Sequence, residues 1–122
     1  MYALRGATSV ERNEPEAIWA ASEALARALL ESNGLTPDHL VSALWTATPD
    51  LNAAFPATGA RRCGFASVPM LGAQELAVPG APEGIIRVLL HVDGPRPARL
   101  EHVYLGRAAT LRPDLIAPEG RS

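Results

Sequence analysis

The chain has 122 residues, of which 48% are hydrophobic and 20% are charged, and its formal net charge at pH 7 is −2. These values predict one soluble globular domain over residues 1–122 and exclude a disordered chain, and the negative charge argues against a nucleic-acid partner. No apolar run approaches the ~20 residues that span a bilayer, Arg5 comes too early for a secretory signal, and Cys63 alone cannot build a disulfide framework. We therefore expect a cytoplasmic protein that binds neither nucleic acid nor a membrane.

The first predicted elements are a short strand over residues 2–7 and one long helix. Asn13 is the predicted N-cap of this helix, because Glu16 follows three residues later as in a capping box. Asn33 and Gly34 are predicted to end the helix, since both residues suit left-handed backbone. The helix carries an apolar stripe at helical spacing, formed by Ile18, Ala21, Leu25, Ala28 and Leu29.

The rest of the chain is predicted to hold four more strands. A short helical turn is expected at residues 36–38, and turns with short helical pieces are expected in the proline-rich stretch TPDLNAAFPATGARRCG. A mobile C-terminal tail is expected at about residues 113–122. The strand candidates, separated by loops rich in glycine and proline, are residues 41–47, 67–76, 85–92 and 101–105.

This inventory predicts an α+β fold in which a five-stranded mixed sheet packs on one long helix. Five strands at ~4.8 Å spacing make a sheet more than about 20 Å wide, whereas one helix covers about 10 Å of it. Because a domain must bury its apolar faces in layers, part of the sheet is expected to pack against another copy of the chain. The sequence therefore predicts a homo-oligomer.

One strand candidate, EGIIRVLLHV, carries an arginine at its centre. Side chains alternate between the two faces of a strand. Arg87 is therefore predicted on one face, and the other face is formed only by apolar residues. A guanidinium stays charged at ordinary pH and needs water or a matched anion. The residues of the apolar face are Ile86, Val88, Leu90 and Val92.

Three further polar side chains, Arg5, Glu75 and Tyr104, also lie within apolar strand candidates. Taken singly, each has an ordinary explanation: an ion pair between Arg87 and Glu75, an exposed arginine on an edge strand, or a core tyrosine with its hydroxyl at the surface. Taken together, two arginines and one carboxylate leave a surplus positive charge. Such a surplus calls for an anion, most naturally a carboxylate or a phosphate.

Several kinds of chemistry have no motif in the chain. The three histidines lack metal-ligand spacing, and neither a glycine-rich phosphate loop nor a G-x-S-x-G nucleophile motif occurs. Cys63 follows two arginines that could lower its pKa, but an ordinary free thiol is the simpler interpretation. We expect a chemistry that needs no protein nucleophile, no metal and no cofactor.

Seven motifs follow one another along the chain: LRGATSVER, TATPDLNAAFPA, the Arg61 that follows, VPMLGAQEL, IIRV, HVYL and LRPDL. In these motifs and their order the chain resembles the monofunctional chorismate mutases of the trimeric pseudo-α/β-barrel class, the AroH class, almost from end to end. The resemblance implies that the chain trimerises, with active sites between subunits, and that it converts chorismate to prephenate by an intramolecular Claisen rearrangement.

The resemblance also implies roles for the polar strand residues. Arg87 would stabilise the negative charge that grows on the ether oxygen as its bond to the ring breaks. Arg5 and Tyr104 would hold the enolpyruvyl carboxylate, and Glu75 would accept a hydrogen bond from the ring hydroxyl. Fixing the reactive chair-like conformer in this way lowers the barrier by orientation.

Other family positions are implied to come from elsewhere in the trimer. Phe55 and Ala57, with Arg61 at the rim, would reach the site from the adjacent subunit. Leu111 and Arg112 would belong to a C-terminal segment that closes over the ligand.

Two positions depart from the family pattern. Gly72 stands where a cysteine or another small polar residue is common, and Thr58 stands where a lysine often follows F-P-A. Both changes would lie beside the substrate, so the resemblance predicts weaker binding.

Two other functions stay open at this point. One is a non-catalytic trimer that binds a small carboxylate metabolite with the same arginines. The other is an enzyme on a similar trimeric architecture, such as an imine-hydrolysing deaminase, which would leave Glu75 and the motifs LRGAT and LRPDL unexplained.

Overall fold

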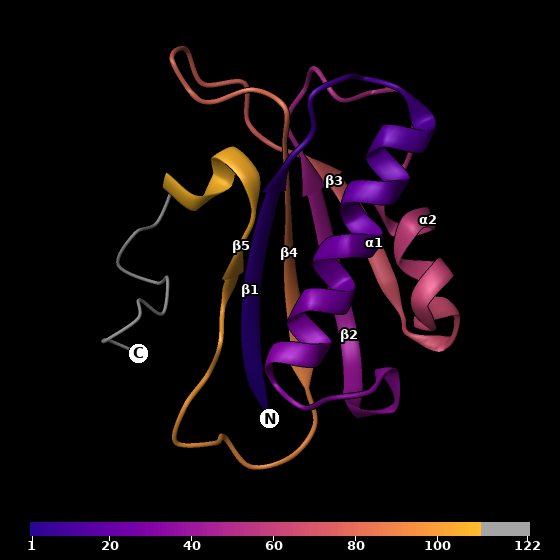
Figure 1. The fold of residues 1–122 in the computed structure, drawn as a ribbon, viewed down its shortest axis with the longest axis vertical. Helices are drawn as coiled ribbons and strands as arrows, with labels where there is room; N and C mark the ends of the chain where they lie inside the picture. The colour runs from indigo at the N-terminus through magenta and orange to yellow at the C-terminus, as the bar shows by residue number, and fades with distance from the viewer. Residues whose placement is uncertain (111–122) are drawn as a thin grey trace.

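The computed structural model describes residues 1–110, which form a five-stranded mixed sheet with two α-helices on one face (Figure 1). Its strands are β1 Tyr2–Ser9, β2 Leu40–Ala47, β3 Met70–Gln74, β4 Ile85–Val92 and β5 Val103–Tyr104. Its helices are α1 Pro15–Ser32 and α2 Pro56–Ala60, and short 3₁₀ turns lie at Pro37–His39, Arg61–Cys63, Phe65–Ser67 and Gly106–Thr110. The predicted α+β fold, with one long helix against a five-stranded sheet, is confirmed.

The sheet has the strand order β3-β2-β4-β1-β5. The central strands are antiparallel, because β4 pairs with both β1 and β2. The two edges are parallel, because β3 runs alongside β2 and β5 runs alongside β1. This order brings β1 and β4, which are about eighty residues apart in the chain, side by side in the middle of the sheet.

The main core lies between α1, α2 and one face of the sheet. Alternation along β4 is as predicted: the apolar series that begins at Ile86 faces the helices, and Arg87 faces away. Burial of each large apolar side chain in this layer contributes about 1.5–3 kcal/mol. The fully buried members of the layer include Leu4, Ile18, Leu25, Leu29, Trp45, Ile86, Leu90 and Val92.

The start of α1 differs from the prediction. The N-cap residue is Glu14, whose side chain makes no capping bond, and Pro15 occupies the first helical position. The prediction of a capping box at Asn13 was wrong, because the Asn13 side-chain oxygen accepts the backbone N–H groups of Asn52 and Ala53, each at 3.0 Å. Asn13 therefore fastens the loop after β2 to the entry of the helix.

A capping box does form further along, where none was predicted. At the 3₁₀ turn Pro37–His39, Thr36 and His39 exchange the reciprocal bonds of the motif. The predicted end of α1 is confirmed, because Asn33 is the C-cap and Gly34 follows at a φ of 63°.

The edge strands are shorter than their patterns predicted. The candidate at residues 67–76 contracts to β3, because Phe65–Ser67 forms a 3₁₀ turn and Pro69 has no N–H to add to the ladder. The candidate at residues 101–105 contracts to the two residues of β5. The tail predicted to be mobile, at about residues 113–122, lies outside the described residues.

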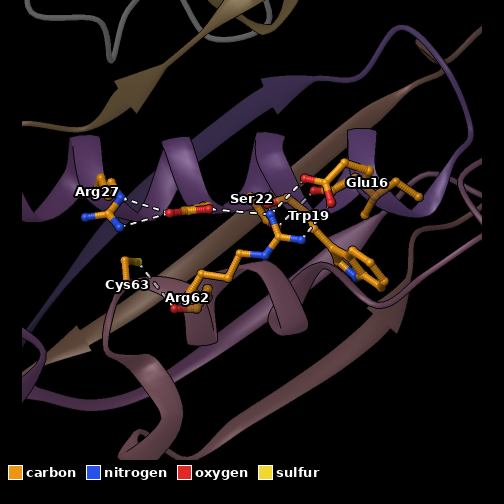
Figure 2. A network of polar contacts seen from close by, with 9 residues as sticks. Glu16, Trp19, Ser22, Arg27, Arg62 and Cys63 are labelled. Carbon is orange, nitrogen blue, oxygen red and sulfur yellow. Dashed lines mark hydrogen bonds and ion pairs between the residues drawn. The ribbon is translucent and has the colours of Figure 1, made fainter.

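The two helices pack closely through Gly59. A Cβ atom at this position would collide with the Ser22 hydroxyl and with the carbonyl oxygen of Trp19, so the close approach requires glycine. At the same contact, the Arg62 guanidinium binds both carboxylate oxygens of Glu16 at 2.8 Å and lies 5.4 Å from the centre of the Trp19 ring (Figure 2). These contacts fix the segment that follows α2 against α1.

The opposite face of the sheet is covered by no α-helix among residues 1–110. Leu44 on β2 and Leu71 on β3 are exposed on this face to 38% and 73%. Leu76 and Val78, just beyond β3, are exposed to 84% and 57%. This apolar surface is of the kind that marks contacts between proteins, as the width of the sheet predicted.

Within the described residues, no helix is long and apolar enough to cross a membrane.

Candidate active site

Arg87 and Glu75 form an ion pair on the face of the sheet that the helices leave open. Arg87 projects from the middle of β4, and its Nη1 donates to Oε1 of Glu75, which lies one residue past the end of β3. The two side chains are 35% and 16% exposed. The pair is therefore accessible from solvent while its carboxylate is largely shielded.

Glu75 is held from two further sides. Its backbone N–H donates to the carbonyl of Ala47 at 2.9 Å, which continues the parallel ladder beyond β3. The hydroxyl of Thr46 donates to its Oε2 at 2.7 Å. Thr46 is also the cross-strand partner of Arg87 in the β2/β4 ladder, so the three side chains share one face.

Arg5 and Tyr104 lie on the same face as Arg87. In the β1/β4 ladder Arg5 is opposite Leu89 and Ala7 is opposite Arg87, and in the β1/β5 ladder Ala7 is opposite Tyr104. Together these residues line a hollow of about 370 Å³, whose floor includes Leu44, Thr46 and Leu89.

The charges in this hollow do not balance. No ion pair to Arg5 occurs among residues 1–110, and Glu75 is the acidic partner of Arg87. Two guanidinium groups therefore line this hollow, and the one carboxylate paired with them, Glu75, binds Arg87 from the β3 side of the sheet. A mostly apolar floor with two such cations and a phenol can bind a small organic anion by bidentate hydrogen bonds.

A second hollow of about 270 Å³ opens beside the ion pair and is lined by Arg87, Glu75 and the loop that follows Glu75. This loop runs from Leu76 to Glu83. Its far end is fixed because both oxygens of the Asp50 carboxylate accept the backbone N–H of Gly84, at 3.2 Å and 3.0 Å. Gly84 has a φ of 68°, which favours glycine at this turn.

A separate group of predicted residues gathers at the β3 edge of the sheet. Phe55, Ala57, Arg61 and Gly72 line a hollow of about 160 Å³ there, and the Phe55 ring is 78% exposed. Within one chain the structure does not bring this group to Arg87.

Gly72 belongs to this edge group although it is three residues from Glu75. Three positions along an extended chain reverse the face, so a Cβ atom at Gly72 would point toward the Trp45 carbonyl at 3.8 Å, while Glu75 faces Arg87. The two remaining predicted positions, Leu111 and Arg112, lie outside the described residues.

A family model described as chorismate mutase type I matches residues 1–115 of the chain. The chain belongs to this family. Two curated relatives are named chorismate mutase AroH: the protein from Thermus thermophilus is 45% identical over 115 residues, which cover 92% of this chain and 93% of that protein. The protein from Bacillus subtilis (strain 168) is 40% identical over 114 residues, which cover 92% and 90%.

A solved structure leads to the same family. A chorismate mutase from Clostridium thermocellum superposes with a TM-score of 0.85 at 40% sequence identity, covering 88% of this chain and 97% of that one. The resemblance inferred from the seven motifs is thus confirmed at the level of family and fold.

Two polar residues that contact the candidate site were missed by the sequence reasoning. Thr46 contacts Glu75, and His102 accepts the backbone N–H of Arg5 at its Nδ1, at 3.0 Å. The signal that revealed Arg87, a polar residue inside an apolar strand, is also present in LWTAT for Thr46. For His102, the signal was its place two residues before Tyr104 in HVYL.

The other candidate chemistry in the sequence has no geometric support in the described part of the chain. Burial raises the pKa of the Cys63 thiol, so the flanking arginines do not activate it. No group of three or more potential metal ligands occurs within residues 1–110.

Proposed function

We propose that this protein is a chorismate mutase that converts chorismate to prephenate by an intramolecular Claisen rearrangement. The observation that carries the proposal is the hollow lined by Arg5, Arg87 and Tyr104, whose Arg87 is paired with a single carboxylate, Glu75. Chorismate is a dianion with an ether bond and a ring hydroxyl, and its rearrangement requires no proton transfer and no nucleophile. A site of fixed cations with few other reactive groups suits such a reaction.

Each residue has a distinct role in this proposal. Arg5 and the Tyr104 hydroxyl hold the enolpyruvyl carboxylate, which folds the side chain over the ring in the reactive conformer. Arg87 donates to the ether oxygen, where negative charge grows in the transition state. Glu75 accepts a hydrogen bond from the ring hydroxyl.

Arg87 can donate a hydrogen bond to the substrate and keep its bond to Glu75. A guanidinium has five N–H donors, and one of them is used by the Glu75 carboxylate. Because Thr46 holds the other oxygen of Glu75, the pair is fixed before substrate binds. Fixed charges need no reorganisation when the bond breaks, which is the source of their catalytic effect.

We further propose that the active form is a homotrimer with each active site between two subunits. The exposed apolar face of the sheet supports this assembly, since the described helices leave it uncovered. In the trimer the edge group would complete the neighbouring site: Phe55, Ala57, Arg61 and Gly72 of one subunit would face Arg87 of the next. Leu111 and Arg112 would follow as the closing segment.

The whole chain would then act as one domain over residues 1–122, without metal or cofactor, in aromatic amino acid biosynthesis in the cytoplasm. Family membership does not favour the alternative of a non-catalytic trimer that binds a small carboxylate. The glycine at position 72 predicts weaker substrate binding, and it does not predict a loss of catalysis.

The test is the loss of chorismate ultraviolet absorbance with purified protein and no added metal or cofactor. Acidification of the product, which converts prephenate to phenylpyruvate, identifies it. Enzyme-dependent loss with a matching yield of phenylpyruvate is the expected result. A folded protein that binds chorismate but does not accelerate its loss would contradict the proposal and favour the binding module.

A further inference from the structure

The strand that carries Tyr104 is held to the sheet by very few bonds. β5 is two residues long, and its ladder with β1 pairs Val103 with Gly6 and Tyr104 with Ala7. After this ladder, the Leu105 N–H donates to the carbonyl of Ala7 at 2.9 Å. So short a parallel ladder does not by itself fix the position of Tyr104 relative to β1.

His102 supplies the missing bond at the start of this ladder. Its Nδ1 accepts the backbone N–H of Arg5 at 3.0 Å. Arg5 comes directly before Gly6, the first β1 residue that is paired with β5. The imidazole thereby replaces a backbone carbonyl in the ladder and joins two residues that are 97 positions apart in the chain. This bond therefore adds to the few that link the strand of Arg5 to the strand of Tyr104.

We propose that His102 is a positioning residue of the mutase, which sets the spacing of Arg5 and Tyr104 through its neutral ring and so governs substrate affinity. The inference rests on the proposed function, in which these two side chains hold one carboxylate. Its hydrogen bond goes to the backbone of Arg5 and not to Arg87, so His102 acts on the groups that hold the carboxylate and not on the bond that breaks.

The bond requires a neutral imidazole, because a protonated ring has no acceptor nitrogen. Burial, and after it the charges of Arg5 on β1 and Arg96 in the preceding loop, lower the pKa of His102 below its ordinary value, and Glu101 opposes this shift. The C-cap residue of α1, the uncharged Asn33, is bonded to this segment through the backbone of Glu101. The bond is therefore complete at neutral pH and is lost as pH falls through the lowered pKa of His102.

The experiment combines kinetics and nuclear magnetic resonance on the full chain. KM and kcat for chorismate are measured from pH 5 to pH 8 for the wild type, His102→Ala and His102→Asn, while ¹⁵N-histidine spectra report the tautomer and protonation of His102. The Asn side-chain oxygen can take the place of Nδ1 as an acceptor but does not titrate. His39→Asn is the matched control, because His39 also accepts a backbone N–H at Nδ1, from Thr36 at 3.0 Å, but lies on the turn before β2.

We expect His102→Ala to raise KM about fivefold at pH 7.5, as for the loss of one hydrogen bond, with kcat changed less than about twofold. The wild-type KM should rise with falling pH over the range in which His102 protonates, and His102→Asn should keep a low KM without that rise. His39→Asn should follow the wild type.

Three results would overturn the inference: an unchanged KM in His102→Ala, a pH-dependent rise in KM that persists in His102→Asn, or a ring protonated on Nδ1 at pH 7.5. If His102→Ala does not fold, the comparison of wild type with His102→Asn decides. If no variant turns over chorismate, the proposed function fails, and the inference is then judged by the ring tautomer and by whether the Arg5 amide shift follows the titration of His102.

Discussion

Replacement of Arg87 by alanine separates the catalytic role of this arginine from its structural role. In the wild type, Nη1 of Arg87 donates to Glu75, and the two side chains are 35% and 16% exposed. The substitution removes the proposed donor to the ether oxygen. It also leaves the shielded Glu75 carboxylate with Thr46 as its remaining side-chain donor among the described residues.

The two effects differ in size. Loss of one donor to a developing anion lowers kcat by about 10²–10³, which corresponds to about 2.7–4 kcal/mol of transition-state stabilisation. Breaking an exposed ion pair costs about 0–1 kcal/mol and breaking a fully buried pair costs about 3–5 kcal/mol. For this partly exposed pair we expect a loss of roughly 1–2 kcal/mol in the free energy of unfolding. A domain of ordinary stability, about 5–15 kcal/mol, stays folded after such a loss.

The assay measures kcat from chorismate absorbance and the free energy of unfolding from urea titration. Arg87→Lys should also lose most activity, because one ammonium cannot reproduce the fork. The double variant Arg87→Ala/Glu75→Gln should regain stability without regaining kcat, since it removes the unpaired charge. Arg12→Ala is the matched control, because the Arg12 side chain is 74% exposed and its pair with Glu14 is 3.5 Å long. A folded Arg87→Ala protein with kcat within threefold of the wild type would refute the electrostatic role.

Three other predictions concern neighbouring features. Thr46→Val should lower kcat about five- to tenfold by freeing the Glu75 carboxylate, and Thr46→Ser should restore most of it; equal rates in both variants would show that the hydroxyl is idle. Gly59→Ala should lower the free energy of unfolding by about 1–3 kcal/mol in urea titration, because the added methyl group collides with α1, whereas Gly72→Ala, with 3.8 Å of room, should not. Leu71→Asp should lower the mass measured by light scattering from trimer to monomer and abolish turnover, and an intact active trimer would place the interface elsewhere.

The elements whose residue pattern repeats over many positions could be predicted from the amino-acid sequence. Alternation along β4 placed Arg87 opposite its apolar neighbours, and the stripe of α1 identified the helix and its buried face. Such patterns predict secondary structure well because every residue in the repeat favours the same structure and the same buried face, and their combined preference outweighs any single contact. The seven ordered motifs likewise led to the family before any distance was known.

The ends of the short elements and the contacts between distant side chains depend on the packing of the folded chain. Asn13 had the sequence of an N-cap, but it binds the loop at Asn52 instead, because a distant partner offered two backbone donors. β3 and β5 are short, since a parallel edge strand is held by one neighbour and ends where that ladder ends.

In the candidate active site, contacts between distant residues could likewise not be predicted from the sequence. The sequence revealed Arg5, Arg87 and Tyr104 as polar residues in apolar strands, but it could not show that Gly72 gathers with Phe55 and Arg61 at the β3 edge. Nor could it show that His102 binds the backbone of Arg5, 97 residues away. Local patterns fix the direction of a side chain, whereas contacts between distant residues depend on strand order and register, which only the packed sheet sets.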